Sequence, residues 1–372
     1  MKKIKINSEF FELPQRKFVN KFKLSKFNFE PIELYDKSPC IYISPNVSRV
    51  DKLFVTKCIS KKFVFLKQDI VSNINNNNFN ENKQKELLDE IKNLAKNNIS
   101  ISLFFNSSPT IFGENEKITE SLALFLYKTE LDLKFLTFPG LFYDFPVWAD
   151  EPRKTKIYTT QNVTIKHRML IGFNKKEIVK TISGATPASA STYNSKQPVH
   201  LNSNKLACHL ERVMYCCPVC EKLFSLYSEF SCIKCKNCGT AIEFSPDGNI
   251  LFSNKISTFE GIENFQFNAL TKKDFQINEL ITYKKITQIL HRNCRKTIKI
   301  DIILQIYAEK IVITDSKKQN SQELFFENID EINYYENNII EIKTKNANQF
   351  YFYGKNNENL FILKDLLKIN KN

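Results

Sequence analysis

The sequence contains little histidine and little glycine, with 4 His and 8 Gly among 372 residues. Histidine is the side chain whose ordinary pKa lies nearest to neutral pH, so few positions are available for a histidine general base. These positions are His167, His200, His209 and His291. The sequence has no Gly-x-Ser-x-Gly nucleophile motif and no glycine-rich phosphate loop. Serine hydrolases of the nucleophile-elbow type and P-loop nucleotide-binding proteins are therefore excluded.

Long apolar runs are also missing. No window approaches the roughly 18 apolar residues of a membrane-spanning helix, and Leu122–Tyr127 is among the longest apolar runs. The opening Met1–Lys5 is charged but no apolar stretch follows it, which is a poor match to a secretory signal peptide. We therefore expect a cytoplasmic protein. In such a protein the 10 cysteines indicate metal ligands or free thiols more than disulfides.

Positive charge dominates and is unevenly placed. The formal net charge is +14, and residues 1–67 contain 15 Lys and Arg against 6 Asp and Glu, a difference of +9. A concentrated basic surface attracts phosphate groups, on either lipid headgroups or nucleic acid. Compositional drift towards Lys, Asn, Ile and Phe would produce the same excess without any ligand.

Short β-rich runs alternate with helix-like stretches in the first half of the chain. The β-rich runs are 40–44, 62–66, 99–105 and 133–139. The helix-like stretches are about 50–59, 81–96 and 117–129. This alternation is typical of an α/β sheet with crossover connections. We predict an α/β domain over residues 1–204.

The pattern changes after residue 204. A helical apolar face, which would lead into a cysteine cluster within 205–250, is formed by Leu206, Leu210, Val213 and Met214. A linker over 251–282 is predicted to be helical around Phe259–Leu270. Alternating apolar residues over 283–372 predict several antiparallel strands closed by a helix at about Glu358–Ile369. This last region resembles a small β-rich domain of the pleckstrin-homology (PH) type.

Two Cys-x-x-Cys pairs, separated by 14 residues, predict a zinc ribbon. Two such turns supply the four thiolates that a tetrahedral Zn²⁺ prefers, and the expected ligands are Cys217, Cys220, Cys235 and Cys238. A register that uses Cys232 with Cys235 is also open, although the glycine after Cys238 favours the first set. Four thiolates leave no position for water, so the ion would be structural. The ribbon has few Lys and no Arg, which disfavours nucleic acid as its partner.

The first β-α unit carries a resemblance to a known family. Ile41–Leu53 reads Ile-Tyr-Ile-Ser-Pro-Asn-Val-Ser-Arg-Val-Asp-Lys-Leu, and Phe63–Lys67 follows as a strand that ends in Lys. This resembles the bacterial glycerolipid (1-acyl-sn-glycerol-3-phosphate, or lysophosphatidic acid) acyltransferases, whose first motif is Asn-His-x-Ser-x-x-Asp. The resemblance implies that 1–204 has the acyltransferase fold and that Ser48 contacts substrate.

Further blocks match the family in order along about residues 30–245. Phe105–Thr110, followed by Gly113, occupies the place of the family's Phe-Pro-Glu-Gly-Thr-Arg block. Pro146–Ala149 with Arg153 resembles a Pro-Arg-Trp-Ala stretch of a subgroup that carries a C-terminal ribbon, which implies a substrate-binding role for Arg153. Leu206–Tyr215, running into Cys217, resembles the helix that enters that subgroup's ribbon.

The residues that carry the family's chemistry are replaced. The resemblance implies a His that takes a proton from a glycerol hydroxyl and an Asp that orients the His; here Asn46 stands in the His position and Asp51 is retained. An amide cannot accept a proton near neutral pH, and loss of a general base costs about 10²–10⁴-fold in rate. Ser107 and Thr110 stand where the family has the Glu and Arg that hold the glycerol phosphate.

Three functions remain open at this stage. The first is a catalytically impaired, lipid-binding member of the acyltransferase family, peripheral at the inner face of the membrane. The second is an active acyltransferase, in which acyl-CoA or an acyl carrier protein is the donor and water or Asp51 compensates for the missing His. The third is a nucleic-acid-binding protein that uses the ribbon and the basic surface.

Overall fold

The computed structural model describes residues 6–14, 27–30, 34, 36–48, 50–106, 108–158, 160–252, 255–272, 281–292, 296–315, 321–335, 338–346, 348–354 and 358–371. The chain divides into two compact units. The first unit contains residues 1–144 and 154–199, and the second contains 145–153 and 200–372. No helix among the described residues is long and apolar enough to cross a membrane.

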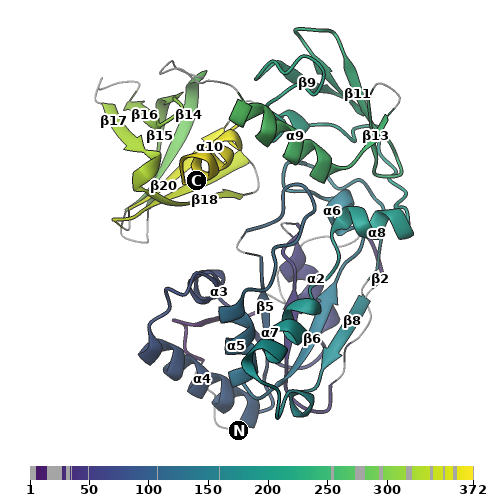
Figure 1. The fold of residues 1–372 in the computed structure, drawn as a ribbon, viewed down its shortest axis with the longest axis vertical. Helices are drawn as coiled ribbons and strands as arrows, with labels where there is room; N and C mark the ends of the chain where they lie inside the picture. The colour runs from purple at the N-terminus through teal and green to yellow at the C-terminus, as the bar shows by residue number, and fades with distance from the viewer. Residues whose placement is uncertain are drawn as a thin grey trace. The chain divides into compact units, whose positions relative to one another are not determined.

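The first unit is built on a six-stranded sheet in the order β1-β4-β5-β3-β6-β8, of which Figure 1 labels β5, β6 and β8. Its strands are β1 (Phe11–Glu12), β3 (Cys40–Ser44), β4 (Phe63–Leu66), β5 (Ser100–Phe104), β6 (Asp132–Thr137) and β8 (Thr160–Ile165). The four central strands are parallel, and β1 and β8 are antiparallel edge strands. A separate parallel pair is formed by β2 (Asn28–Glu30) and β7 (Lys156–Tyr158).

Helices cover this sheet because their apolar faces match its two faces. The helices of the unit are α2 (Asp51–Cys58), α3 (Gln68–Asn75), α4 (Glu81–Lys96), α5 (Glu120–Lys128), α6 (Leu141–Asp144), α7 (Lys175–Gly184) and α8 (Ala190–Lys196), with a 3₁₀ turn η2 at His167–Met169. Leu87 of α4, Leu122 of α5 and Ile182 of α7 join one core with Ile41 and Ile101 of the sheet. The predicted α/β organisation of this region is therefore present, and the predicted helices at 50–59, 81–96 and 117–129 correspond to α2, α4 and α5.

The second unit begins its sheet structure in the cysteine-rich region. A five-stranded antiparallel sheet runs in the order β13-β12-β11-β10-β9. The strands are β9 (Leu226–Glu229), β10 (Cys232–Cys235), β11 (Ala241–Phe244), β12 (Ile250–Phe252) and β13 (Lys255–Ser257), and α9 (Phe259–Lys272) follows. The helix predicted within 251–282 is therefore present as α9, but β13 precedes it and extends the ribbon sheet into the region expected to be a linker.

The helix predicted before the cysteines is wrong. Residues 205–215 form turns and the short 3₁₀ helix η3 (Leu210–Arg212), and His209 adopts a left-handed conformation with φ of 69° that interrupts any α-helix. Leu206, Leu210 and Val213 are nevertheless buried. The apolar spacing that suggested a helical face thus reflects burial of irregular backbone.

The remainder of the second unit is a seven-stranded antiparallel sheet in the order β17-β16-β15-β14-β20-β19-β18, with a C-terminal helix. The elements are β14 (Ile281–Arg292), β15 (Lys296–Ile306), β16 (Lys310–Asp315), β17 (Ser321–Phe325), η4 (Phe326–Asn328), β18 (Ile329–Tyr335), β19 (Ile339–Thr344), β20 (Gln349–Gly354) and α10 (Ile362–Lys371). Figure 1 shows α10 (yellow) beside these strands. Strands closed by one terminal helix agree with the predicted β-rich domain.

Candidate functional site

The loop after β3 leads to Asp51, the Asp of the sequence resemblance. Asp51 is the first residue of α2, and its Oδ2 accepts hydrogen bonds from the backbone N–H groups of Val47 (3.1 Å) and Ser48 (2.5 Å). Its Oδ1 is buried and finds no hydrogen-bond donor among the described residues. Burial raises the pKa of Asp51 to about 8, although the two backbone hydrogen bonds act in the opposite direction. The carboxylate therefore fixes the backbone of its own loop.

Asn46, in the family's His position, joins this loop to the one after β5. Its backbone carbonyl accepts hydrogen bonds from Thr110 N (2.8 Å) and from Asn106 Nδ2 (3.2 Å). Thr110, in the family's Arg position, uses its hydroxyl to accept from Gly113 N at 3.1 Å. Ser107, in the family's Glu position, lies outside the described residues. The motif positions that are described therefore act as loop supports.

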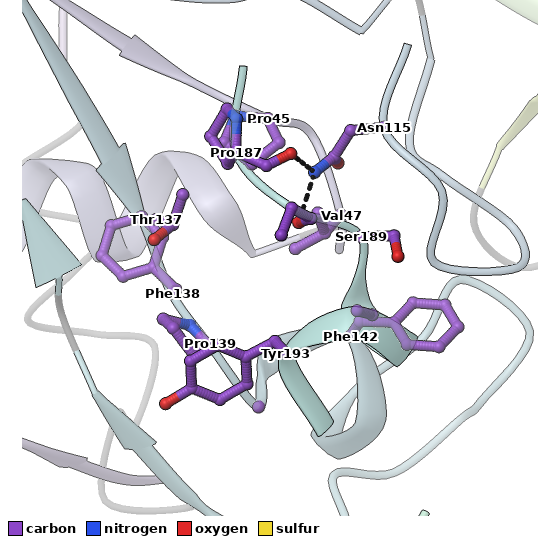
Figure 2. Close-up of a pocket in the computed structure, with 13 residues that line it drawn as sticks. Pro45, Val47, Asn115, Thr137, Phe138, Pro139, Phe142, Pro187, Ser189 and Tyr193 are labelled. Carbon is purple, nitrogen blue, oxygen red and sulfur yellow. Dashed lines mark hydrogen bonds between the residues drawn. The ribbon is translucent and has the colours of Figure 1, made fainter. Parts of the chain in front are cut away.

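Asparagine side chains extend this network. Asn106 Oδ1 accepts from Glu116 N at 3.0 Å, and Asn106 Nδ2 lies 3.5 Å from Asn115 Oδ1. Asn115 Nδ2 then donates to the carbonyls of Pro187 (3.1 Å) and Ala188 (3.0 Å), as Figure 2 shows. Three separate stretches of chain are thus held together by uncharged hydrogen bonds.

Gly113 lets two of these stretches approach closely. Its φ is 85°, in the left-handed region that favours glycine. A Cβ at this position would lie 2.8 Å from Ala190 Cβ and 3.0 Å from Phe142 Cε1. The Gly113 carbonyl accepts a hydrogen bond from Ala190 N at 2.8 Å. Gly113 is therefore required by packing, independently of any substrate.

A pocket lies where these loops meet, and we call it the carboxyl-end pocket. Its walls border about 500 Å³ of empty space, a volume that includes open solvent. Its walls, drawn in Figure 2, are Pro45, Val47, Asn115, Thr137, Phe138, Pro139, Gly140, Phe142, Pro187, Ala188, Ser189, Ala190 and Tyr193. Pro45 follows β3 and Phe138 follows β6, so the pocket sits at the carboxyl ends of central parallel strands. Open α/β sheets bind their ligands at this edge.

The chemistry of the pocket wall is apolar. Three aromatic rings, those of Phe138, Phe142 and Tyr193, surround the space together with prolines (Figure 2). None of the lining residues is His, Asp, Glu, Lys or Arg. His167 does not line the pocket. It follows the end of β8 that is farther from the pocket, and its ring lies 5.3 Å from the Tyr127 ring, measured between centroids. The pocket therefore suits a hydrocarbon chain better than a charged group.

Arg153, predicted to bind substrate, belongs to the second unit, whereas the carboxyl-end pocket belongs to the first. Its guanidinium lies over the Phe244 ring at 4.9 Å and donates to the Leu206 carbonyl. Trp148 is fully buried and lies 5.4 Å from the Phe259 ring, measured between centroids. Buried cation–π and hydrogen-bond contacts of this kind stabilise a fold.

The four cysteines of the two Cys-x-x-Cys pairs meet at one point. Their sulfur atoms all lie within 4.8 Å of one another, with Cys217 and Cys238 3.8 Å apart and Cys220 and Cys235 3.7 Å apart. Sulfurs placed about 2.3 Å from a tetrahedral ion are about 3.8 Å apart. Cys232 is not a member of the cluster among the described residues. The geometry therefore fits a metal ion held by the first of the two predicted ligand sets.

Hydrogen bonds to sulfur prepare this cluster for a cation. Ser225 Oγ lies 3.2 Å from Cys235 Sγ, and Asn237 N donates to the same sulfur at 3.4 Å. Burial raises the pKa of Cys235, but these donors outweigh it and leave the pKa at about 6. Gly239, with φ of 72°, turns the second knuckle so that its N–H donates to the Cys235 carbonyl at 3.0 Å. Donors of this kind stabilise thiolates.

Several residues of the carboxyl-end pocket were not anticipated from the sequence, namely Asn115, Phe138–Gly140, Phe142, Pro187–Ala190 and Tyr193. Phe138 lies near the carboxyl end of the predicted strand 133–139, so its place at the ligand-binding edge of the sheet was available as a signal. The Pro187–Tyr193 segment gave no such signal, because its Ser, Ala and Pro content indicated only a loop.

No protein-family model matches the sequence, and no curated protein matches it either. Among solved structures, an LPA acyltransferase, PlsC, from Thermotoga maritima is similar over 46% of this chain and 80% of its own, with 14% identity and a TM-score of 0.32. The N-terminal PH domain of human ARAP2 is similar over 26% of this chain and 80% of its own, with 12% identity and a TM-score of 0.21. A C-terminal domain of an unknown protein from Leishmania infantum matches over 31% and 94%, with 13% identity and a TM-score of 0.19.

Proposed function

We propose that this chain is a lipid-binding protein, which holds the acyl chain of a lysophospholipid in the carboxyl-end pocket and does not transfer acyl groups. The observation that carries the proposal is an apolar pocket at the ligand-binding edge of the sheet, bordered by a motif loop whose base position is Asn46. An acyl chain gains about 0.8 kcal/mol for each CH₂ that it buries. Phe138, Phe142 and Tyr193 line the pocket and would contact such a chain.

The same loops lack the groups that acyl transfer requires. A general base must lie within hydrogen-bond reach of the hydroxyl that it deprotonates. Asn46 cannot accept a proton, and Asp51 Oδ2 is occupied by the N–H groups of Val47 and Ser48. Thr110 brings no positive charge to hold a phosphate. Binding without turnover is the chemistry that these residues support.

An active acyltransferase is the second candidate, and one observation favours it. Asp51 keeps a buried oxygen, Oδ1, without a donor among the described residues, and its pKa of about 8 is suited to proton transfer near neutral pH. In that case acyl-CoA or an acyl carrier protein would supply the acyl group. Activity would then disappear in Asp51→Asn.

We further propose that the four-cysteine cluster holds Zn²⁺ with a structural role. Four thiolates in tetrahedral spacing are typical of zinc, and a closed ligand set leaves no open position for substrate or water. The ion would connect the turn at Cys217–Cys220 to the turn at Cys235–Cys238. It would supply folding energy to the second unit and no chemistry to the pocket.

The lipid-binding proposal is tested by filling the pocket. Ala188→Trp places an indole at an exposed edge of the wall, and Thr192→Trp is the matched control on an exposed position of α8 that does not line the pocket. Titration with monomeric lysophosphatidic acid should show saturable binding to the native chain. Ala188→Trp should weaken it at least about tenfold, or about 1.4 kcal/mol.

Two results would contradict this proposal. Equal affinity of Ala188→Trp and Thr192→Trp would place the ligand elsewhere. Transfer of acyl groups to lysophosphatidic acid by the native chain, lost in Asp51→Asn, would favour the enzyme.

A further inference from the structure

Three large apolar side chains are exposed close together on the segment that follows β8. Met169 is 61% exposed, Ile171 is 66% exposed and Phe173 is 43% exposed. Leu170, between Met169 and Ile171 in the sequence, is buried in the core of the first unit. Scattered exposed apolar residues are common, but three within five residues form a local patch of the kind that contacts a partner or a lipid surface.

The segment is held in a defined conformation by its neighbours. His167 N donates to Asp132 Oδ1 at 2.9 Å, and Leu170 N donates to the His167 carbonyl at 2.9 Å. Asn174 caps α7 through a reciprocal pair of hydrogen bonds with Glu177. The three apolar side chains are therefore presented by a preorganised turn, so little conformational entropy is lost when they are covered.

Positive charge surrounds the apolar side chains. Residues 166–176 contain Lys166, Arg168, Lys175 and Lys176 and no Asp or Glu. Lys166 pairs with Asp132 at 2.9 Å and Lys175 pairs with Glu120 at 2.6 Å, in exposed ion pairs of the kind that contribute little to stability. Arg168 and Lys176 form no ion pair with any of the residues that the structure describes. Apolar side chains flanked by cations match a lipid interface, where long basic side chains reach the phosphate groups.

We propose that Lys166–Lys176, the docking segment, inserts Met169, Ile171 and Phe173 into the interface of an anionic bilayer. The occupant is a membrane and not a protein groove, because the positive charge lies on both sides of the apolar side chains and complements a continuous sheet of phosphates. Apolar insertion and electrostatic attraction together make the two signals that stable peripheral binding requires.

The docking segment is separate from the carboxyl-end pocket. Since β8 is antiparallel to β6, with Ile165 paired to Leu133 and Thr160 paired to Thr137, β8 ends at the amino edge of the parallel strands. The pocket lies at the opposite, carboxyl edge. The docking proposal rests on the proposed lipid function only in its choice of a lipid partner. The docking proposal and the pocket proposal can therefore fail independently of each other.

The first experiment places a reporter in the segment. The chain has one tryptophan, Trp148, which is fully buried in the second unit. In Ile171→Trp, the emission should shift to the blue with vesicles of phosphatidylserine and phosphatidylcholine, and brominated acyl chains should quench it. The native chain, with Trp148 alone, is the control. An unshifted, unquenched spectrum with vesicles that sediment the protein would overturn the proposal.

The second experiment removes each signal in turn. The triple change Met169→Ser, Ile171→Ser and Phe173→Ser should reduce partition into anionic vesicles at least about tenfold. Leu13→Ser removes a side chain that is 64% exposed in the same unit and should leave partition unchanged. Arg168→Gln and Lys176→Gln should each reduce it by about fivefold at low salt.

Three outcomes would overturn the inference: no sedimentation of the native chain with anionic vesicles, equal partition of the triple variant, or a native dimer that the triple change converts to a monomer. The last would identify a second copy of this chain as the occupant. Ala188→Trp should keep full vesicle binding, so a failure of the pocket and a failure of the docking segment are distinguishable.

Discussion

Sequence motifs pointed to both the four-cysteine cluster and the loops beside the carboxyl-end pocket. The two motifs differ in how many of the expected side chains they contain. The cluster keeps every side chain that its chemistry needs, at tetrahedral spacing. The loops beside the pocket carry Asn46 and Thr110 where the sequence resemblance implies a His and an Arg. The proposed lipid-binding function therefore depends on the shape and apolar lining of the pocket, whereas the proposed zinc site depends on four specific ligand side chains.

This contrast is sharpest when one ligand is removed. Cys235→Ser should abolish binding of the single ion and destabilise the second unit by more than about 5 kcal/mol, because structural zinc contributes about 10–16 kcal/mol to folding of small domains. Elemental analysis and thermal unfolding measure both effects. Cys232→Ser is the control, since Cys232 lies outside the cluster. One zinc per chain retained in Cys235→Ser would refute the assigned ligands.

A second change separates stability from substrate binding at Arg153. Arg153→Met removes the cation over Phe244 and the donor to Leu206, and it should lower the free energy of unfolding by about 2–4 kcal/mol. The affinity for lysophosphatidic acid should stay the same. Lys205→Met, at an exposed position of the same unit, is the control. A folded variant with normal stability and lost lipid binding would restore the substrate-binding role.

Asp51 gives a pH-dependent prediction. Its pKa is about 8 in the folded chain and near 4 when unfolded, so between these values the folded state binds the extra proton. Stability due to Asp51 therefore falls as the pH rises from about 4 to 8. Asp51→Asn removes this loss, so the stability of the variant relative to the native chain should be about 3.5 kcal/mol higher at pH 8 than at pH 5.

Urea unfolding of both proteins at pH 5 and pH 8 measures this difference. Asn retains one carbonyl oxygen to accept from Val47 and Ser48, so the loop geometry should persist. A constant difference between the two proteins at both pH values would show that folding does not raise the pKa of Asp51.

The smallest effect is expected at Asn46. Asn46→His restores the family's base but leaves Thr110 uncharged, so acyl transfer should remain absent and the affinity for lysophosphatidic acid should change by no more than about twofold. The acyl-transfer assay and the binding titration are run on the same preparation. Appearance of transfer in this variant alone would show that a single substitution separates the chain from catalysis.

The elements that could be predicted are those with a strong local signal. The alternation in 40–44 and 99–105 gave β3 and β5, and the apolar periodicity of 81–96 gave α4 to the residue. The four cysteines lie within 22 residues of the sequence, so local turns are enough to bring their sulfur atoms together. The helix before them was wrong because burial of Leu206 and Val213 imitates helical spacing.

The carboxyl-end pocket could not be predicted in full because its walls come from separate stretches of chain. Val47, Phe138 and Ala188 are far apart in sequence, and only the strand order brings them together. The hydrogen bonds of Asn115 to Pro187 and Ala188 depend on that same tertiary arrangement. Composition indicated a loop at 187–193 but carried no information on what the loop would face.

The central claim is that this chain binds a lysophospholipid without acylating it, and one measurement tests it directly. Native protein is incubated with lysophosphatidic acid and a labelled acyl-CoA, and bound lysolipid and diacylated product are measured in the same sample. We predict saturable binding, weakened in Ala188→Trp, with no product above the protein-free reaction. Product that forms with the native chain and vanishes in Asp51→Asn would contradict the account.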